Sequence, residues 1–235
     1  MENLIIEIRE ELKLNTDEKT QASGQNYFKE KINSYGVKVP TVHKISKDFY
    51  KRLEGHDKEE VFALCEILWQ SGYIEESFVA CNWSYWVHAQ YVAEDIRVFE
   101  RWIDRYVGNW ASCDTLCNHT VGTFVEMYPE HLAKLKHFAK SDNRWMRRAA
   151  AVTLIIPARR GKFLDDILEI ADILLLDGDD LVQKGYGWML KAASESNQPA
   201  IFEYVMKNKS TMPRTALRYA IEKMPKEMKM AAMAK

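Results

Sequence analysis

The sequence predicts an all-α protein built from antiparallel helix pairs. Apolar residues recur with the 3.6-residue period of amphipathic helices along nearly the whole chain, and no segment alternates apolar and polar residues convincingly enough for a strand. The links between these segments are mostly short, which favours helices that pack antiparallel to their neighbours. The 235 residues include only 10 Gly and 6 Pro, so the chain is long enough for a substantial core and poor in residues that break helices.

The first half of the chain is expected to hold six helices. Thr41 is the expected N-cap of the third, since its hydroxyl can accept a hydrogen bond from the first turn. The fifth carries five aromatic residues and is apolar on most sides, so we expect it to be buried. The glycine-containing link at 36–40 ends the second helix, and Gly72 ends the fourth. The expected helical ranges are 4–12, 16–33, 41–53, 61–69, 74–91 and 93–107.

The second half continues the same pattern. Pro129 is expected to begin a helix, and Ser141 or Asp142 is expected to cap the arginine-rich helix that follows. Gly185 and Gly187 lie inside an expected helix, where glycine is unfavourable unless another element packs close by. The other expected ranges are 110–128, 162–176, 180–195, 199–208 and 213–224, followed by a short basic tail.

Helix pairs recur at intervals of about 35–45 residues, which is typical of helical repeat proteins. We therefore predict a single HEAT-like helical repeat domain over residues 1–235. In this α-solenoid of antiparallel helix pairs, the inner helices line a concave groove. A globular helix bundle is the alternative fold.

Charge is segregated along the chain, although the net charge is only −1. Residues 134–162 include nine Lys or Arg and one acid, and residues 163–180 include seven acids and no base. Residues 207–229 are basic again. Such segregation is expected where one surface meets a polyanion, so we predict that the groove is basic. The alternative is that solvated helix faces cluster by chance.

Several classes of site and location are not supported. Cys65, Cys81, Cys113 and Cys117 do not form a secreted disulfide framework, and even with nearby His119 the spacing fits no zinc site. We expect four buried thiols, no metal and no cofactor. The sequence shows neither a signal peptide nor a membrane-spanning segment, so we expect a cytoplasmic protein that acts as a monomer.

Trp110 and Asp114 form the most informative pair in the sequence. If a helix begins near residue 110, they lie on one face and one turn apart. A buried carboxylate needs a partner, so the pair is unusual for a core. It suits a site for a flat cationic group, because the indole face attracts a cation and the carboxylate supplies negative charge. The alternative is a core tryptophan next to a solvated, capping aspartate.

Together with other pieces in the same order, this pair resembles the HEAT-like-repeat DNA alkylation repair family, the alkylpurine DNA glycosylases. In the resemblance, Asp114 corresponds to the catalytic carboxylate. Trp110, Trp188 and Tyr27 correspond to the aromatic residues of the lesion cleft, and Arg148 to a basic residue beside it. The matching pieces are Tyr27 ahead of 36–40 (GVKVP), Trp110 with Asp114, 141–150 (SDNRWMRRAA) and 183–188 (QKGYGW).

The resemblance also implies a partner, which is double-stranded DNA with alkylated bases. Arg144 and Arg147, on the helix of Arg148, are expected to contact this DNA, with Lys184 and Lys191 near the rim of the groove. The sequence departs from the family's best-known members at Lys191, where they carry arginine, and at Asp180-Leu181, where they carry an aromatic pair.

The expected reaction is hydrolysis of the N-glycosidic bond of a purine alkylated at N3 or N7. Such a base is already cationic and leaves without a general acid, so one aspartate can stabilise the oxocarbenium-like sugar and place the water. The resemblance implies that the base need not enter a deep pocket. Two alternatives remain: a non-catalytic paralogue that binds bent or branched DNA, and a helical-repeat scaffold for protein partners.

Overall fold

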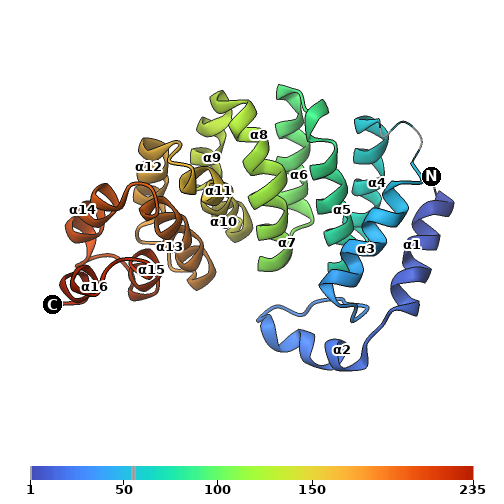
Figure 1. Ribbon diagram of the computed structural model, residues 1–235, viewed down its shortest axis with the longest axis horizontal. Coiled ribbons are helices and arrows are strands. Elements are labelled where there is room, and N and C mark those ends of the chain that lie inside the picture. The colour runs from blue at the N-terminus through green and yellow to red at the C-terminus, as the bar shows by residue number, and fades with distance from the viewer. Residues whose placement is uncertain (1, 54, 56, 235) are drawn as a thin grey trace. The chain divides into compact units, whose positions relative to one another are not determined.

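The computed structural model describes residues 2–53, 55 and 57–234 (Figure 1). These residues form sixteen α-helices, four short 3-10 helices and one π-helix, and none of them lies in a β-strand. An isolated bridge pairs Asn33 with Tyr73. The all-α prediction is confirmed. No helix in the described part of the chain is long and apolar enough to cross a membrane.

The chain divides into two compact units by its internal contacts, unit 1 (Met1–Leu116) and unit 2 (Cys117–Lys235). Within each unit, packing joins some helices that are consecutive in the sequence and others that are separated by one or two helices. The single repeat domain over residues 1–235 and its concave basic groove stay predictions.

In unit 1, α5 is the central helix. It packs against α3, α4 and α7, and α1 packs against α3 and α4. Trp83 of α5 is fully buried, and its Nε1 donates a hydrogen bond to the Ser46 carbonyl at 2.8 Å. The prediction of a buried fifth helix is therefore confirmed. The α-helices of the described part of unit 1 are α1 (Glu2–Leu14), α2 (Glu18–Gly24), α3 (Val39–Tyr50), α4 (Lys58–Gln70), α5 (Ile74–Trp86), α6 (Ile96–Arg105) and α7 (Trp110–Thr115).

The second helix is much shorter than predicted. After α2, a single 3-10 turn, η1 (Gln25–Tyr27), leads into irregular chain that ends at α3. Within the predicted range, the Gln25 side chain donates to the carbonyls of Phe28 and Glu30, and Asn33 pairs with Tyr73 instead of continuing a helix. The backbone N–H groups of residues 35–37, in the link that follows, donate to the buried carboxylate of Glu75 on α5. The prediction of a Thr41 cap is also wrong, because α3 already begins at Val39 with a proline in its first turn.

In unit 2, α13 is the central helix and packs against α10, α11, α12, α14 and α15. The predicted 110–128 helix is interrupted by a π-helical segment, η4 (Leu116–Val121). The N-cap of α10 is Asn143, not Ser141 or Asp142, since its side chain accepts from Trp145 N at 2.9 Å. The α-helices of the described part of unit 2 are α8 (Gly122–Met127), α9 (Leu132–Phe138), α10 (Arg144–Val152), α11 (Ile155–Arg159), α12 (Leu164–Leu174), α13 (Asp180–Ser194), α14 (Gln198–Asn208), α15 (Arg214–Ala220) and α16 (Lys226–Met233).

The two glycines of α13 allow the close packing that the sequence indicated. A Cβ atom at Gly187 would lie 2.7 Å from the Cβ of Tyr219 and 2.8 Å from the carbonyl oxygen of Ala216, at α15. A Cβ at Gly185 would lie 3.4 Å from the Cγ of Arg148 on α10. Both contacts are within unit 2, so α13 is approached closely from two sides.

Gly187→Ala is expected to destabilise unit 2. The added methyl group meets backbone, which cannot move as a flexible side chain can, so the free energy of unfolding should fall by about 1–3 kcal/mol. Gly178→Ala is the matched control, since no heavy atom lies within 4 Å of a Cβ there and stability should be kept. Thermal unfolding followed by circular dichroism measures both. Equal midpoints for the two variants would contradict the close approach of α13 and α15.

Candidate functional site

Trp110 is held by the segment that contains Tyr27. Its indole Nε1 donates a hydrogen bond to the backbone carbonyl of Tyr27 at 3.1 Å. The ring of Phe28 stacks on the indole with 5.4 Å between centroids and 22° between planes. Two residues predicted for the site, 83 positions apart in the sequence, are thus brought together. Phe28 was not among the residues predicted from the sequence, where its position next to Tyr27 is the only signal for it.

An apolar pocket of about 380 Å³ lies beside this aromatic pair. Its walls come from α2, η1, α5 and the start of α7, and the side chain of Tyr27 at its edge is 72% exposed. The pocket is therefore bounded by aromatic and aliphatic groups with a few polar atoms. The lining residues that bear on the argument are Tyr27, Phe28, Val39, Glu75, Phe78 and Trp110.

Asp114 lies one helical turn after Trp110 and is 8% exposed. Its helix, α7, begins at Trp110, and the side chain of Asn109 caps it by accepting from Ser112 N at 2.9 Å. The π-helical segment η4 follows directly. Such segments cost stability and are frequent at functional sites. The predicted spacing of an indole and a carboxylate within one turn is present in the structure.

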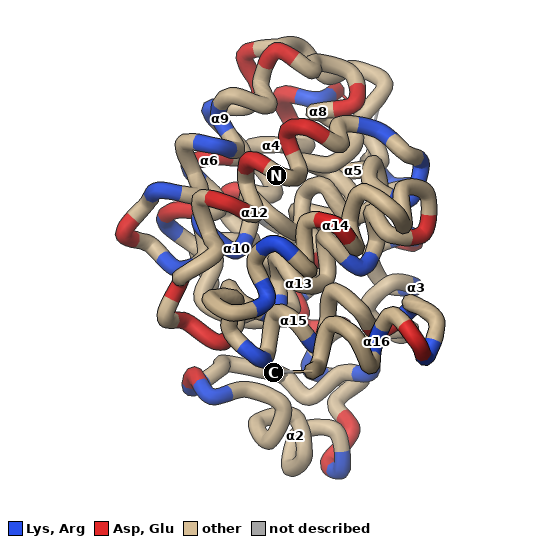
Figure 2. The backbone as a smooth tube through the Cα atoms, turned by 90° about the vertical axis from the view of Figure 1, so that its left-hand side faces the viewer, with Lys and Arg blue, Asp and Glu red and all other residues tan. Residues whose placement is uncertain are grey.

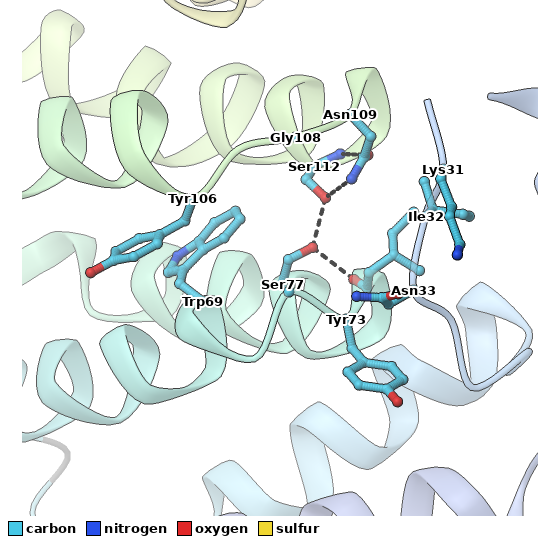
Figure 3. A pocket seen from close by; sticks show the side chains of 12 residues that line it. Lys31, Ile32, Asn33, Trp69, Tyr73, Ser77, Tyr106, Gly108, Asn109 and Ser112 are labelled. Atoms are coloured by element: carbon cyan, nitrogen blue, oxygen red, sulfur yellow. Dashed lines mark hydrogen bonds between the residues drawn. The ribbon is translucent and has the colours of Figure 1, made fainter. Parts of the chain in front are cut away.

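The start of α7 is anchored to α5 by a chain of hydroxyl groups (Figure 3). The Ser77 hydroxyl donates to the Ile74 carbonyl at 2.7 Å and lies 2.7 Å from the Ser112 hydroxyl. The Asn109 amide donates to the same Ser112 oxygen at 3.0 Å. Ser77, Asn109 and Ser112 also line a small polar pocket of about 90 Å³. Their hydrogen bonds fix the backbone next to Trp110.

In unit 2, the three arginines predicted to contact DNA tie α10 to the chain around the start of α13. The Arg144 Nη2 lies 2.8 Å from a carboxylate oxygen of Asp179, and the Arg147 Nε lies 2.6 Å from one of Asp177. The Arg148 side chain is 5% exposed and donates to the Leu181 carbonyl. Their guanidinium groups thus support the link before α13 and its first turn.

The helix α13 carries the other predicted residues of unit 2. Lys184 pairs with Asp180 at 3.3 Å, and both side chains are 37% exposed. Lys191 pairs with Glu222 at 2.9 Å, and its Nζ lies 5.5 Å from the centroid of the Tyr219 ring. Trp188 is partly exposed on the same helix. The structure therefore groups Trp188, Lys184 and Lys191 on α13, next to the α10 arginines.

The sequence matches the DNA alkylation repair enzyme family over residues 8–224, which is most of the chain. The chain belongs to this family. Its fold is similar to that of a solved structure described as a predicted DNA alkylation repair enzyme from Enterococcus faecalis. The two share 20% sequence identity at a TM-score of 0.79, and the similarity covers 90% of this chain and 98% of the other. No curated protein matches the sequence. The family assigns the protein to the repair of alkylated DNA.

In this DNA alkylation repair protein, positions of Lys and Arg are interspersed with positions of Asp and Glu along the backbone (Figure 2). Many cations of residues 134–162 pair with acids within unit 2. Lys136 lies 2.9 Å from Asp166 on α12, and Arg160 and Lys162 both contact Glu126 on α8. The charge that is segregated along the sequence is thus partly balanced in space. These pairs are partly buried, because Lys136 and Asp166 are 25% exposed and Glu126 is 12% exposed, so their cations are less free for a phosphate than those of exposed pairs.

The thiols of the repair protein are buried, as predicted. All four cysteines are free and at most 2% exposed. Burial raises the pKa of the Cys65 thiol well above its ordinary value, and Cys65 donates to the Ala80 carbonyl. A thiol that stays protonated is a poor nucleophile, so Cys65 serves the core of unit 1.

Asp17, the N-cap of α2, allows a test of the contacts that stabilise this helix. Hydrogen bonds from Lys38 and Thr20 lower the pKa of Asp17 from 3.8 to about 2. Because the folded pKa is depressed, the ionised carboxylate stabilises α2 fully above pH of about 4, and this is lost as the pH falls through about 2. A carbon-13 NMR titration of the Asp17 carboxyl should show this low midpoint. Lys38→Gln should move it towards 3.8, and an unmoved midpoint would contradict the role of Lys38.

Proposed function

We propose that the protein is a DNA glycosylase that removes cationic N3- or N7-alkylated purines from duplex DNA by hydrolysis of the N-glycosidic bond. The observation that carries the proposal is the pair formed by Trp110 and Asp114. The indole is fixed by the Tyr27 carbonyl and the Phe28 ring, and the carboxylate lies one turn away with 8% exposure. Family membership supports a repair enzyme, and this pair supports the choice of reaction.

The chemistry needs little beyond this pair. A purine alkylated at N3 or N7 carries a positive charge and leaves as a neutral base, so the electrons of the breaking C–N bond neutralise it and positive charge develops on the sugar. The Asp114 carboxylate stabilises that charge and orients the water that attacks C1′. The Trp110 face attracts the cationic base, a contribution of about 0.5–2 kcal/mol. Following the resemblance, we also propose that Tyr27 and Trp188 contact damaged DNA.

The DNA backbone is assigned to residues of α10 and α13. Lys184 and its partner Asp180 are both 37% exposed, so Lys184 can turn to a phosphate at small cost. Lys191 is 14% exposed and is held by Glu222 and the Tyr219 ring, so it contacts DNA only by leaving them. Arg144 forms an ion pair with Asp179, and Arg147 forms one with Asp177. Arg148 donates a hydrogen bond to the Leu181 carbonyl in the first turn of α13. We propose that the protein binds as a monomer to duplex DNA with alkylated bases, without a cofactor.

Asp114→Asn is expected to remove excision while keeping the fold. The amide has the shape of the carboxylate but lacks the charge that the developing sugar cation needs. The single-turnover rate on a 7-methylguanine duplex should therefore fall roughly a hundredfold to a thousandfold. Affinity for undamaged duplex should be unchanged or slightly higher, because repulsion between Asp114 and phosphate is relieved.

Asp48→Asn is the matched control, since it makes the same change of charge in unit 1 at an exposed residue whose Lys51 pair is 3.9 Å long. It should excise at the wild-type rate. Wild-type excision by a folded Asp114→Asn protein would end the catalytic assignment. DNA binding without release of a methylated purine by the wild type would instead indicate the non-catalytic paralogue, and absence of salt-dependent DNA binding would indicate the protein scaffold.

Lys184→Gln is expected to weaken DNA binding without changing stability. Loss of one phosphate contact should make the slope of log affinity against log salt shallower by about one. The melting temperature should hold, because the exposed pair with Asp180 contributes little. Titrations of duplex DNA at several salt concentrations measure the slope. An unchanged slope would remove Lys184 from the DNA-binding surface.

A further inference from the structure

Glu75 occupies an unusual place for an acid. It lies in the first turn of α5, is 2% exposed and lines the same apolar pocket as Trp110. A carboxylate buried to this degree is unfavourable unless donors surround it. Four donors do. The Ser34 hydroxyl lies 2.7 Å away, and the N–H groups of residues 35–37 lie 2.8–3.1 Å away.

The loop of residues 34–37, which bonds to Glu75, is also in contact with α2. The carbonyl of Gly36 accepts a hydrogen bond from Asp17 N at 2.9 Å, and Lys38 pairs with the Asp17 carboxylate at 2.9 Å. Gly36 adopts φ +80°, and a Cβ there would lie 2.5 Å from the Cβ of Gln21. The loop and α2 are therefore in close contact along the backbone. This contact is important for the position of α2, because α2 has no buried residue of its own to anchor it.

The far end of α2 reaches the indole. η1 follows α2 without a break, and the carbonyl of Tyr27, its last residue, accepts from Trp110 Nε1. Phe28 comes next and stacks on the same ring. The amide of Gln25 fixes this turn by donating to the carbonyls of Phe28 and Glu30 at 3.3 and 2.8 Å. In Figure 1, α2 is the short helix set apart from α1 and α3 in unit 1.

We propose that Glu75 is a positioning residue for Trp110. Its carboxylate fixes the backbone of residues 34–37, and this loop fixes the position of α2. The turn that follows α2 then places the Tyr27 carbonyl and the Phe28 ring, which orient the indole. All of these contacts lie within unit 1. The consequence for the reaction rests on the proposed glycosylase function, whereas the consequence for the orientation of Trp110 does not.

The test replaces Glu75 by glutamine, which keeps the size but puts an amide donor or a weaker acceptor against four donors. The protein has seven tryptophans, so it is labelled with 5-fluorotryptophan, and the fluorine-19 resonance of Trp110 is assigned with Trp110→Phe. In Glu75→Gln the Trp110 resonance should shift or broaden. Single-turnover excision should fall roughly tenfold, as expected when a substrate-contacting group is misplaced, with affinity for undamaged duplex within about twofold.

Glu66→Gln is the matched control, because Glu66 is another acid of unit 1 that holds a different tryptophan. Its carboxylate accepts from Trp102 Nε1 at 2.6 Å and from the Tyr106 hydroxyl at 2.6 Å. This variant should move the Trp102 resonance, assigned with Trp102→Phe, and leave Trp110 and the excision rate unchanged. A loss of stability alone would not produce this crossed pattern.

An unmoved Trp110 resonance in folded Glu75→Gln would overturn the proposal. A moved resonance with wild-type excision would overturn its consequence for the reaction. If the wild type excises no alkylpurine, the glycosylase proposal fails, and the fluorine spectra still decide whether Glu75 positions Trp110. Should Glu75→Gln not fold, Ser34→Ala removes one donor only. It is expected to move the Trp110 resonance, and an unmoved resonance there would count against the proposal in the same way.

Discussion

Unit 1 depends on the pairing of acids that its packing takes out of water. Glu75, Glu76 and Asp95 are at most 6% exposed, and each would be costly without donors. Glu76 accepts hydrogen bonds from Arg9 and from the Tyr35 hydroxyl. Asp95 accepts hydrogen bonds from Lys58 and from the backbone N–H of Val92. Each acid joins segments far apart in the sequence. The 34–37 segment shows this dependence most clearly, because the N–H groups of residues 35–37 all donate to Glu75.

In unit 2 the buried charge that needs a partner is a cation, not an acid. Its buried cation is Arg148, which runs past the bare backbone of Gly185 to the Leu181 carbonyl. Arg144 and Arg147 close on Asp179 and Asp177, the acids just before α13. Removing one partner would leave a partly buried charge unpaired, which costs more than the pair contributes. The arginine-rich segment thus supports α13, and its proposed role with DNA has to be compatible with that support.

The sequence predicted the helices well because their apolar period is local information. It placed α4, α6 and α13 to within a few residues and anticipated the close packing at Gly185 and Gly187. It predicted 16–33 as one helix because nothing in that stretch reveals that its last residue, Asn33, pairs with Tyr73 far along the chain, or that the Gln25 side chain donates to the carbonyls of Phe28 and Glu30. It also overestimated the free positive charge of 134–162, because ion pairing between helices depends on tertiary contacts. Of the proposed site, it found Trp110 and Asp114 by spacing but missed Phe28 and Glu75, whose roles exist only through contacts.

The two sets of proposed site residues answer opposite electrostatic requirements. Stabilising a sugar cation needs an anion at the reacting atom, whereas holding DNA needs cations along the phosphates. A lysine about 4 Å from the developing charge would oppose it by about 4 kcal/mol at an effective dielectric constant of 20, which would undo the contribution expected of the aspartate. Residues 108–119, which include Trp110 and Asp114, contain no Lys or Arg, whereas α10 carries three arginines and α13 two lysines. An aromatic ring attracts the cationic base without adding charge of its own, so a tryptophan next to a single carboxylate meets the first requirement without defeating the second.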